Sequence, residues 1–363
     1  MSGPLVSIII DNYNYERFLP RCIESALAQT YQNTEVVVVD DASTDGSREV
    51  IGRYGSLVPV FRVKNGGQAA ALNSGFAASR GDIVIFLDSD DYLEPESAAR
   101  VVASWRPATA KVQYRLALVG ENGEVIDLMP SADILFDSGD VTQLLLKKGR
   151  YRTTVMSGNA FDRKVLDRIL PIPESEFRIS ADGYLVTLAP LFGGVVSLEE
   201  TLGGYRVHAQ NAWATWAGVD GRRFRKALEH DTQRYRALAH KAAELGFEVP
   251  DDPGRHDWVH LESRLCSLCL EPDQHPFRSD SRAALAWNGF RASWEDLQLS
   301  LKRRSILATW FLSVGLLPRR LARLAISWRL SPAVRPPWVA KVLRLIRGSR
   351  PRRAQFVAGT RER

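Results

Sequence analysis

The segment FLDSDDY at residues 86–92 places three carboxylates within four residues, at Asp88, Asp90 and Asp91. It includes the end of the apolar run at residues 83–87, which is typical of a buried strand. Neighbouring like charges are unfavourable unless a cation neutralises them. Acid-rich sites with only oxygen ligands suit hard divalent ions such as Mg2+ and Mn2+, which often bridge the phosphates of a nucleotide. The pattern therefore favours a site for a metal and a diphosphate over a surface turn.

The first hundred residues alternate short β-branched runs with helical stretches. The expected strands cover residues 5–10, 35–39, 58–63 and 83–87, and the expected helices cover residues 18–29, 46–54 and 69–79. Runs such as VSIII and VVVV lack the polar alternation of a sheet with one wet face. The strands are therefore predicted to be parallel and buried on both faces, in a doubly wound α/β fold.

Carboxylates follow three of these strands. Asp11 follows the first strand, Asp40 and Asp41 follow the second, and the acidic triplet follows the last. In such a sheet the binding crevice lies outside the carboxyl ends of the strands. Helix capping accounts for some of these residues, because DASTDG at residues 41–46 is also a turn and N-cap pattern. It does not account for six acids, so the sequence predicts an acidic rim.

The composition excludes several classes of protein. The chain has 363 residues, 45% hydrophobic and 25% charged, as in a globular protein of about two domains. Cys22, Cys266 and Cys269 are too few for a disulfide scaffold and lack the partners that zinc needs, so buried cysteines are expected. No P-loop or dinucleotide-binding glycine motif is present. Without a secretory pattern or an apolar run long enough to span a bilayer, a cytoplasmic protein is expected.

The charge is unevenly distributed along the chain. There are 48 Lys and Arg against 42 Asp and Glu, but residues 301–363 hold 16 basic residues and one acid. Apolar residues recur there at helical spacing, with Trp at the edges. Such basic helices suit an anionic membrane surface, and packing on the body of the protein or on a second subunit is the alternative. Nucleic-acid binding is not expected, because no recognition fold accompanies the charge.

Two blocks of sequence carry a family resemblance. The block VSIIIDNYNYERFLPRCIESALAQTYQNTEVVVVDDASTDGS, followed by NGGQAAALNSGFAASRGDIVIFLDSDD, resembles the nucleotide-binding half of a family 2 glycosyltransferase. The resemblance implies a GT-A fold with a Rossmann-like, mostly parallel sheet. It also implies a nucleotide diphospho-sugar donor, Mn2+ or Mg2+ as cofactor, and inversion at the anomeric carbon by direct displacement.

The resemblance also assigns residues to the donor site. Tyr13 would lie by the nucleotide, Asp40 and Asp41 would meet the base and ribose, and Asp88 and Asp90 would form the D-x-D pair with Asp90 as the direct metal ligand. Gln68 ends a short glycine turn, Asn65-Gly-Gly-Gln68, that could hold phosphate. Asp11 departs from the pattern, because the family usually has proline there.

Inverting transfer needs a general base for the acceptor hydroxyl, and a carboxylate is the family's usual choice. We expect Asp182 in ISADGYL to be this base, with an N-terminal helix cap as the alternative. The family usually has an acidic pair here, and Ala181 replaces its first member. His208 is predicted to complete the metal shell or to contact diphosphate, with a structural histidine as the alternative. Asn159 is predicted to lie in the acceptor site.

The predicted organisation is a GT-A domain at residues 1–215, a helical region at 216–300 and a basic amphipathic tail at 301–363. Within the first domain, residues 1–110 are the nucleotide-sugar half and residues 111–215 the acceptor half. The predicted function is transfer of a single sugar to a saccharide or lipid-linked glycan in cell-envelope polysaccharide synthesis, at the inner face of the cytoplasmic membrane. A catalytically silent nucleotide-sugar-binding scaffold, tethered by its tail, is the alternative.

Overall fold

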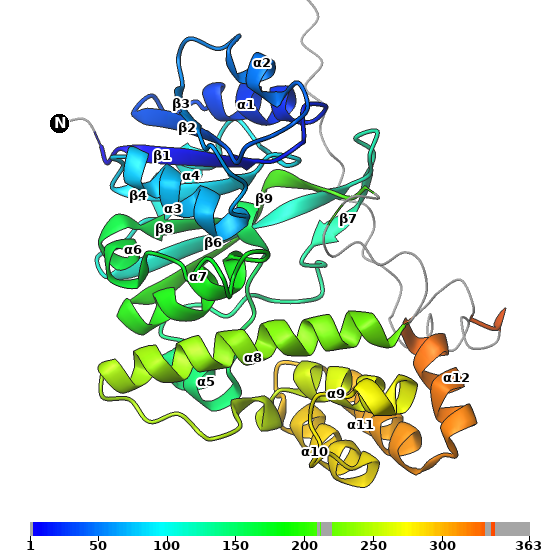
Figure 1. Ribbon diagram of the computed structural model, residues 1–363. Helices are drawn as coiled ribbons and strands as arrows, with labels where there is room; N and C mark the ends of the chain where they lie inside the picture. Colours follow the sequence, from blue (N-terminus) through cyan, green and yellow to red (C-terminus); the bar gives the residue numbers. More distant parts are fainter. Residues whose placement is uncertain (1–2, 209–210, 212–219, 331–334, 338–363) are drawn as a thin grey trace, which may run out of the picture. The chain divides into compact units, whose positions relative to one another are not determined.

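The computed structural model describes residues 3–208, 211, 220–330 and 335–337 (Figure 1). The chain divides into two compact units. Unit 1 contains residues 1–214 and 229–254, and unit 2 contains residues 215–228 and 255–363. The domain boundaries expected after residues 215 and 300 stay predictions.

Unit 1 is built on one sheet, and its elements alternate along the chain. Its strands in the described residues are β1 (Val6–Asn12), β2 (Thr34–Asp40), β3 (Val58–Phe61), β4 (Ile83–Asp88), β5 (Tyr92–Leu93), β6 (Thr109–Val119), β7 (Val125–Met129), β8 (Asn159–Asp162) and β9 (Gly194–Arg206). Its helices are α1 (Leu19–Leu27), α2 (Ser47–Ile51), α3 (Gln68–Ala78), α4 (Ser97–Ser104), α5 (Thr142–Lys148), η1 (Met156–Gly158), α6 (Arg163–Ile169), α7 (Asp182–Leu188) and η2 (Ala189–Phe192). Helix α8 (Gly221–Glu244) begins in unit 2 and ends in unit 1.

The sheet confirms the parallel arrangement predicted for the first hundred residues. Its strand order is β3-β2-β1-β4-β8-β6-β9-β5, with β7 paired to β6. Strand β1 is parallel to β2 and β4, and β2 is parallel to β3. Strand β8 runs antiparallel to β4 and β6, so the sheet is mixed beyond β4. Strands β6 and β7 form an antiparallel hairpin whose connection contains Asn122-Gly123, a pair that favours tight hairpin turns.

Both faces of the sheet are covered by helices (Figure 1). Successive residues of β1 point to opposite faces, as in any strand. Ile9 packs in the core formed with α3, α5, α6 and α7, and Ile8 and Ile10 pack in the core formed with α1, α2 and α4. All three side chains are fully buried. Because the faces are occupied, the strand ends are where polar side chains can meet a ligand.

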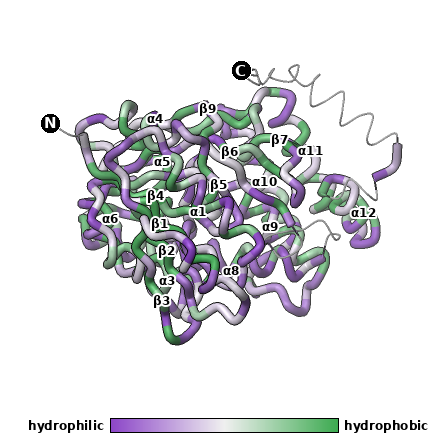
Figure 2. The backbone as a smooth tube through the Cα atoms, turned by 90° about the horizontal axis from the view of Figure 1, so that it is seen from above, coloured by the Kyte–Doolittle hydropathy of each residue, from purple (hydrophilic) through white to green (hydrophobic). Residues whose placement is uncertain are grey.

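Unit 2 is helical in its described residues. Its elements there, after the start of α8, are η3 (Pro253–His256, whose first two residues belong to unit 1), α9 (Trp258–Leu270), η4 (Pro272–Gln274), α10 (Arg282–Glu295), α11 (Leu301–Leu316) and α12 (Arg319–Leu330). Trp310, Phe311 and Val314 of α11 are buried in one core with Cys266 and Cys269, so the apolar stripe of this helix is an internal packing surface. Figure 2 shows hydrophobic and hydrophilic residues alternating along α12.

Three further sequence predictions concern the cysteines, the basic tail and membrane spans. The three cysteines are free and buried, and each lies in a helix, as expected. Residues 338–363 of the basic tail lie outside the described residues. In the described part of the chain, no helix combines the length and the hydrophobicity that crossing a bilayer requires.

Candidate active site

A cleft of about 410 Å³ lies in unit 1 at the carboxyl ends of β1 and β4. The residues of the acidic rim and of the predicted site that lie at its walls are Asp11, Tyr13, Asp41, Gln68, Asp88, Asp90 and Asp182. They come from the ends of strands and from the starts of α3 and α7, far apart in the sequence. The acidic rim expected from the sequence is therefore largely gathered in one cavity.

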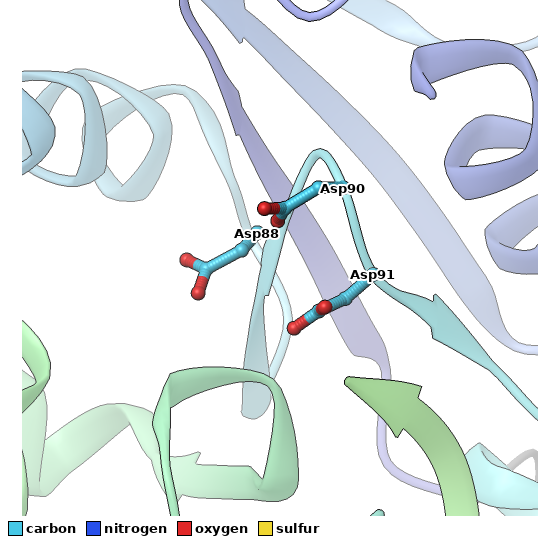
Figure 3. A group of neighbouring side chains, drawn as sticks. All are labelled: Asp88, Asp90 and Asp91. Atoms are coloured by element: carbon cyan, nitrogen blue, oxygen red, sulfur yellow. The ribbon is translucent and has the colours of Figure 1, made fainter. Parts of the chain in front are cut away.

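The acidic triplet forms the turn after β4, and Figure 3 shows its three side chains. One carboxylate oxygen from each of Asp88, Asp90 and Asp91 lies within 4.8 Å of the others. The two oxygens of Asp91 accept hydrogen bonds from Ser157 Oγ (2.6 Å) and the Arg206 backbone N–H (2.9 Å). Burial, followed by the charges of neighbouring aspartates, raises the pKa of Asp88 and Asp91 well above the usual value. Such a cluster is suited to a divalent cation with oxygen ligands.

His208 lies beside this cluster. Its Nε2 atom is 2.9 Å from Asp90 Oδ2, and the same oxygen accepts a hydrogen bond from Asn211 Nδ2 at 3.2 Å. The imidazole stacks on the Phe18 ring with a centroid distance of 4.8 Å. His208 is therefore fixed where it can either share a metal with Asp90 or orient that carboxylate.

Gln68 connects the acidic triplet to the predicted base. Its amide nitrogen donates to Asp88 Oδ1 (2.9 Å), and its amide oxygen accepts from the Ala181 backbone N–H (3.0 Å). Ala181 is the N-cap of α7, so Asp182 is the first helical residue and not the cap. Asp182 Oδ1 accepts from the Gly183 backbone N–H at 2.8 Å. The charge of Asp182 also contributes to the raised pKa of Asp88, as expected for carboxylates facing one cleft.

The glycine turn before α3 is bound to Asp41. The Asp41 carboxylate accepts from the backbone N–H groups of Gly66 (3.0 Å) and Gly67 (2.7 Å). Gly67 has a φ of +85°, and a Cβ there would lie 2.5 Å from the Arg178 backbone oxygen, so glycine is required. Because these amides already bond to Asp41, the turn does not offer them to a phosphate as the sequence suggested. Its role is to fix the start of α3 and thus Gln68.

Besides His208, which contacts Asp90 from beside the cleft, Asp40 and Asn159 are predicted site residues that do not line it. Asp40 is 1% exposed, and its carboxylate accepts from Asn12 Nδ2 (3.0 Å) and the Ser43 backbone N–H (3.2 Å). Asn159 is fully buried, and its amide donates to the Val155 carbonyl at 2.7 Å. Neither side chain lines the cavity. Their assigned contacts with donor and acceptor stay predictions.

The carboxylate of Asp11 lies in the cleft with only part of its hydrogen-bonding capacity satisfied. In the described part of the chain, its buried Oδ1 atom has no hydrogen-bond partner. Burial, and next the charge of Asp90, raises the pKa of Asp11 to about 7. When ionised, this carboxylate adds to the negative potential of the cleft, which a bound cation would offset.

Other residues of the site were not predicted from the sequence. Tyr15 and Arg178 line the cleft, and no motif in the sequence marks them. Ser157 lies two residues before the predicted Asn159, and it touches the triplet where Asn159 does not. Its Oγ atom also accepts a hydrogen bond from the Asp88 backbone N–H at 3.2 Å. Contact with the acidic triplet within this segment therefore comes from Ser157.

The fold and this site define a class of protein. The chain superposes on S. aureus TarS 1-349, solved in complex with UDP-GlcNAc, with a TM-score of 0.53 and 17% identity over 89% of this chain and 88% of that chain. Together with the mixed sheet flanked by helices, this match establishes a fold of the GT-A glycosyltransferase type.

The sequence comparisons give the family. Residues 7–169 match the family described as glycosyl transferase family 2. An uncharacterized glycosyltransferase of Nostoc sp. is 37% identical over 213 residues, covering 57% of this chain and 66% of that protein. The chondroitin synthase of Pasteurella multocida is 44% identical over 97 residues, covering 26% of this chain and 10% of that protein. The chain thus spans just under two thirds of the first relative and a tenth of the second. Through residues 7–169, it belongs to glycosyl transferase family 2.

Proposed function

We propose that the protein is an inverting, divalent-metal-dependent glycosyltransferase. It moves one sugar from a nucleotide diphospho-sugar to a hydroxyl group of a saccharide or lipid-linked glycan, in cell-envelope polysaccharide synthesis. The observation that carries this proposal is the position of Asp182 in the same cleft as Asp88 and Asp90 of the acidic triplet. A cation site and a carboxylate base are the two groups that such a transfer needs.

The residues of the triplet fit a hard divalent ion. Only oxygen atoms are offered, and the raised pKa values of Asp88 and Asp91 reflect a site with excess negative charge. Asp88 and Asp90 line the cleft and would hold Mn2+ or Mg2+, with His208 beside them. When bound, the ion would neutralise charge on the donor diphosphate as the sugar leaves.

The chain's own residues would position the reactants. Tyr13 is 44% exposed at the cleft wall, where its ring can stack on the nucleotide base. Asp182 would accept the proton of the acceptor hydroxyl as the acceptor oxygen bonds to the anomeric carbon and the bond from that carbon to the diphosphate breaks. Gln68 would keep Asp88 and the start of α7 in register during this displacement.

The membrane location is also a proposal. The basic tail would place the enzyme beside a lipid-linked acceptor by binding anionic lipid. Because Trp310 and Phe311 of α11 are packed inside unit 2, removal of all residues from 301 would destroy that core. The test is therefore deletion of residues 338–363 only, followed by sedimentation with anionic liposomes. Unchanged sedimentation would contradict a role for this segment.

The first experiment on the proposed function is a donor panel. Thermal unfolding is followed with UDP, GDP, dTDP and CMP sugars, with and without Mn2+, because a ligand that binds the native state raises its stability. We expect one nucleotide class to raise the unfolding temperature only when Mn2+ is present. The absence of any shift across the whole panel would contradict the proposal.

A silent scaffold is the second candidate, and Asp11 is the observation that favours it. A carboxylate at this position in the cleft opposes a donor diphosphate, and Ala181 stands where the family usually has an acid. A scaffold would give the same thermal shift as an enzyme but no transfer. Release of nucleoside diphosphate from the donor in the presence of a saccharide acceptor separates the two candidates.

A further inference from the structure

We propose that a second cavity of unit 1 binds an oxyanion, and that this oxyanion is an acidic group of the acceptor. The assignment to the acceptor rests on the proposed function, whereas anion binding itself does not. The cavity has a volume of about 240 Å³ and lies against α7, the helix that begins with Asp182. The enzyme would then recognise its acceptor partly through a phosphate or carboxylate group that the acceptor saccharide carries.

The charges around this cavity are the opposite of those around the cleft. Arg150, Arg152 and Arg234 are among its lining residues, and no carboxylate of the described residues lines it. Arginine is suited to phosphate and carboxylate because its planar fork donates two parallel hydrogen bonds. Three arginines at one cavity therefore indicate an oxyanion.

Two of these arginines are held in place from behind. Asp231 Oδ1 accepts hydrogen bonds from Arg150 Nη2 and Arg234 Nη2, each at 2.8 Å. Arg234 is 7% exposed, and Asp231 is 5% exposed. Both belong to the part of α8 that lies in unit 1. The shared aspartate fixes the guanidinium groups, so little side-chain entropy would be lost when an anion binds.

Neutral hydroxyl groups also lie at the wall, and that of Tyr151 already donates to the Val186 carbonyl at 3.0 Å. Thr187 lines the cavity and is 1% exposed, and its Oγ1 atom has no hydrogen-bond partner within the described part of the chain. A buried hydroxyl of this kind is unfavourable unless a ligand or water satisfies it. Tyr151 and Thr153 also line the cavity, and both hydroxyl oxygens accept from Lys111 Nζ, at 3.0 and 2.8 Å. Lys111 is fully buried, which lowers the pKa of its amine, and the two hydrogen bonds that it donates fix these hydroxyls at the cavity wall.

Two chain segments join this cavity to the acidic cleft. Val155 and Met156 line the cleft, whereas Thr153, two residues earlier than Val155, lines the arginine cavity. Helix α7 presents Asp182 to the cleft and Thr187 to the arginine cavity. Five residues of α-helix span about 7.5 Å, which is within the reach of a short oligosaccharide. An acceptor could therefore offer a hydroxyl to Asp182 while its acidic group lies among the arginines.

The test uses the full chain with its donor cleft filled by Mn2+ and the nucleoside diphosphate found in the donor panel. Inorganic phosphate is then titrated and its binding measured by calorimetry. We expect Arg150→Gln to weaken phosphate binding about tenfold or more, because a charge-assisted bond is lost. Arg53→Gln is the matched control, since Arg53 is exposed and does not line either cavity. Equal phosphate affinity in wild type and Arg150→Gln would overturn the site.

Thr187→Val keeps the test decisive if the arginine variant misfolds. Replacement of an unsatisfied buried hydroxyl by a methyl group leaves the fold stable, so weaker phosphate binding would report the site directly. The source of the anion is tested with two acceptors that share one reactive end, one neutral and one carrying a phosphate or uronate. We expect Arg150→Gln to raise KM for the acidic acceptor alone, and free phosphate to compete with it. Equal effects on both acceptors would overturn the assignment to the acceptor.

The two proposals fail separately. If no nucleotide sugar binds, the proposed function fails, and phosphate binding can still be compared between wild type and Arg150→Gln in the absence of nucleotide. If a donor binds and is turned over but phosphate does not bind, the arginine cavity fails and the proposed function stands.

Discussion

The acidic cleft and the arginine cavity share helix α7 but differ in charge and in how that charge is compensated. Five carboxylates line the cleft, with Arg178 as the single arginine among its described lining residues. The arginine cavity has three arginines at its wall and Asp231 directly behind two of them. The cleft thus places several negative charges close together, whereas the arginines of the second cavity are paired with a carboxylate of the protein itself.

This difference indicates how strongly each site depends on a ligand. In the cleft, the pKa of Asp88 and Asp91 is raised, mainly by burial and then by neighbouring carboxylates, so the ionised cluster is unfavourable until a cation binds. In the arginine cavity, the bonds to Asp231 already stabilise the guanidinium groups. We therefore expect tight, obligatory metal binding in the cleft and weaker, selective anion binding at the arginines.

The largest expected effect comes from Asp182→Asn, which changes the cleft end of α7 and leaves the end at the arginine cavity unchanged. Removal of a general base lowers turnover by about 100-fold to 10,000-fold. Donor binding with Mn2+ and phosphate binding at the arginine cavity should stay at wild-type levels, since neither uses Asp182. Turnover is measured as release of nucleoside diphosphate, with Asp167→Asn, an exposed carboxylate of α6, as control. Wild-type turnover in Asp182→Asn would contradict the assignment of the base.

The next effect is on the metal, through His208→Ala. Because His208 Nε2 contacts Asp90 Oδ2 at 2.9 Å, its loss removes either a ligand or the group that orients one. Metal affinity should fall by about 10-fold to 100-fold. It is measured by Mn2+ titration in the presence of the bound nucleotide. The control is His240→Ala, because the His240 side chain is 78% exposed on α8. If both variants bind Mn2+ like wild type, His208 is structural, the alternative that the sequence left open.

The acidic cleft was largely predictable from sequence because its residues follow strands directly. Once β1 and β4 are recognised as adjacent parallel strands, Asp11 and Asp88 must lie side by side, and the register pairs them. The arginine cavity was not predictable in the same way. Arg150 and Arg234 come from a loop and from a helix far along the chain, and no local pattern indicates that Asp231 joins them.

The acceptor half was also harder to predict because its hydrogen bonds join distant segments. Lys111 lies in an apolar strand, and only the fold shows that its side-chain nitrogen donates to the hydroxyls of Tyr151 and Thr153. Likewise, the segment with Ser157 and Asn159 was recognised, but which side chain turns toward the triplet depends on the backbone of η1. The sequence thus indicates which segments meet, whereas side-chain direction at non-strand positions comes from packing.

Gly183→Ala sharpens the comparison by disturbing the helix that both sites share. A Cβ at this position would lie 2.4 Å from His230 Nε2 and 2.9 Å from Arg234 Cδ. Overpacking of this kind costs about 1–3 kcal/mol of folding free energy. We expect a lower unfolding temperature together with weaker phosphate binding, because Arg234 must move. Gly55→Ala is the control, since no atom lies within 4 Å of its new Cβ. Unfolding and phosphate binding like those of wild type would mean that α7 does not couple the two regions.

The smallest expected effect is that of Asp11→Asn on the stability of the metal-free protein. The pKa of Asp11 is raised from 3.8 to about 7, chiefly by burial and then by Asp90, so the folded state binds this proton more tightly than the unfolded state does. The cost of ionising Asp11 is therefore absent below pH 3.8, grows as the pH rises, and is complete above about pH 7. Asparagine does not ionise, so the variant should unfold at a higher temperature than wild type at pH 8, with a smaller difference at pH 5.

Mn2+ distinguishes this electrostatic explanation from a simple packing effect of the asparagine. A bound cation offsets the charge of Asp11, so the advantage of Asp11→Asn at pH 8 should shrink when Mn2+ is added. The control is Asp127→Asn, because Asp127 is an exposed residue of β7 outside the cleft and should show neither the pH trend nor the Mn2+ effect. A stability difference for Asp11→Asn that is the same at pH 5 and pH 8, with and without Mn2+, would mean that Asp11 does not carry the excess charge that sets the cleft apart from the arginine cavity.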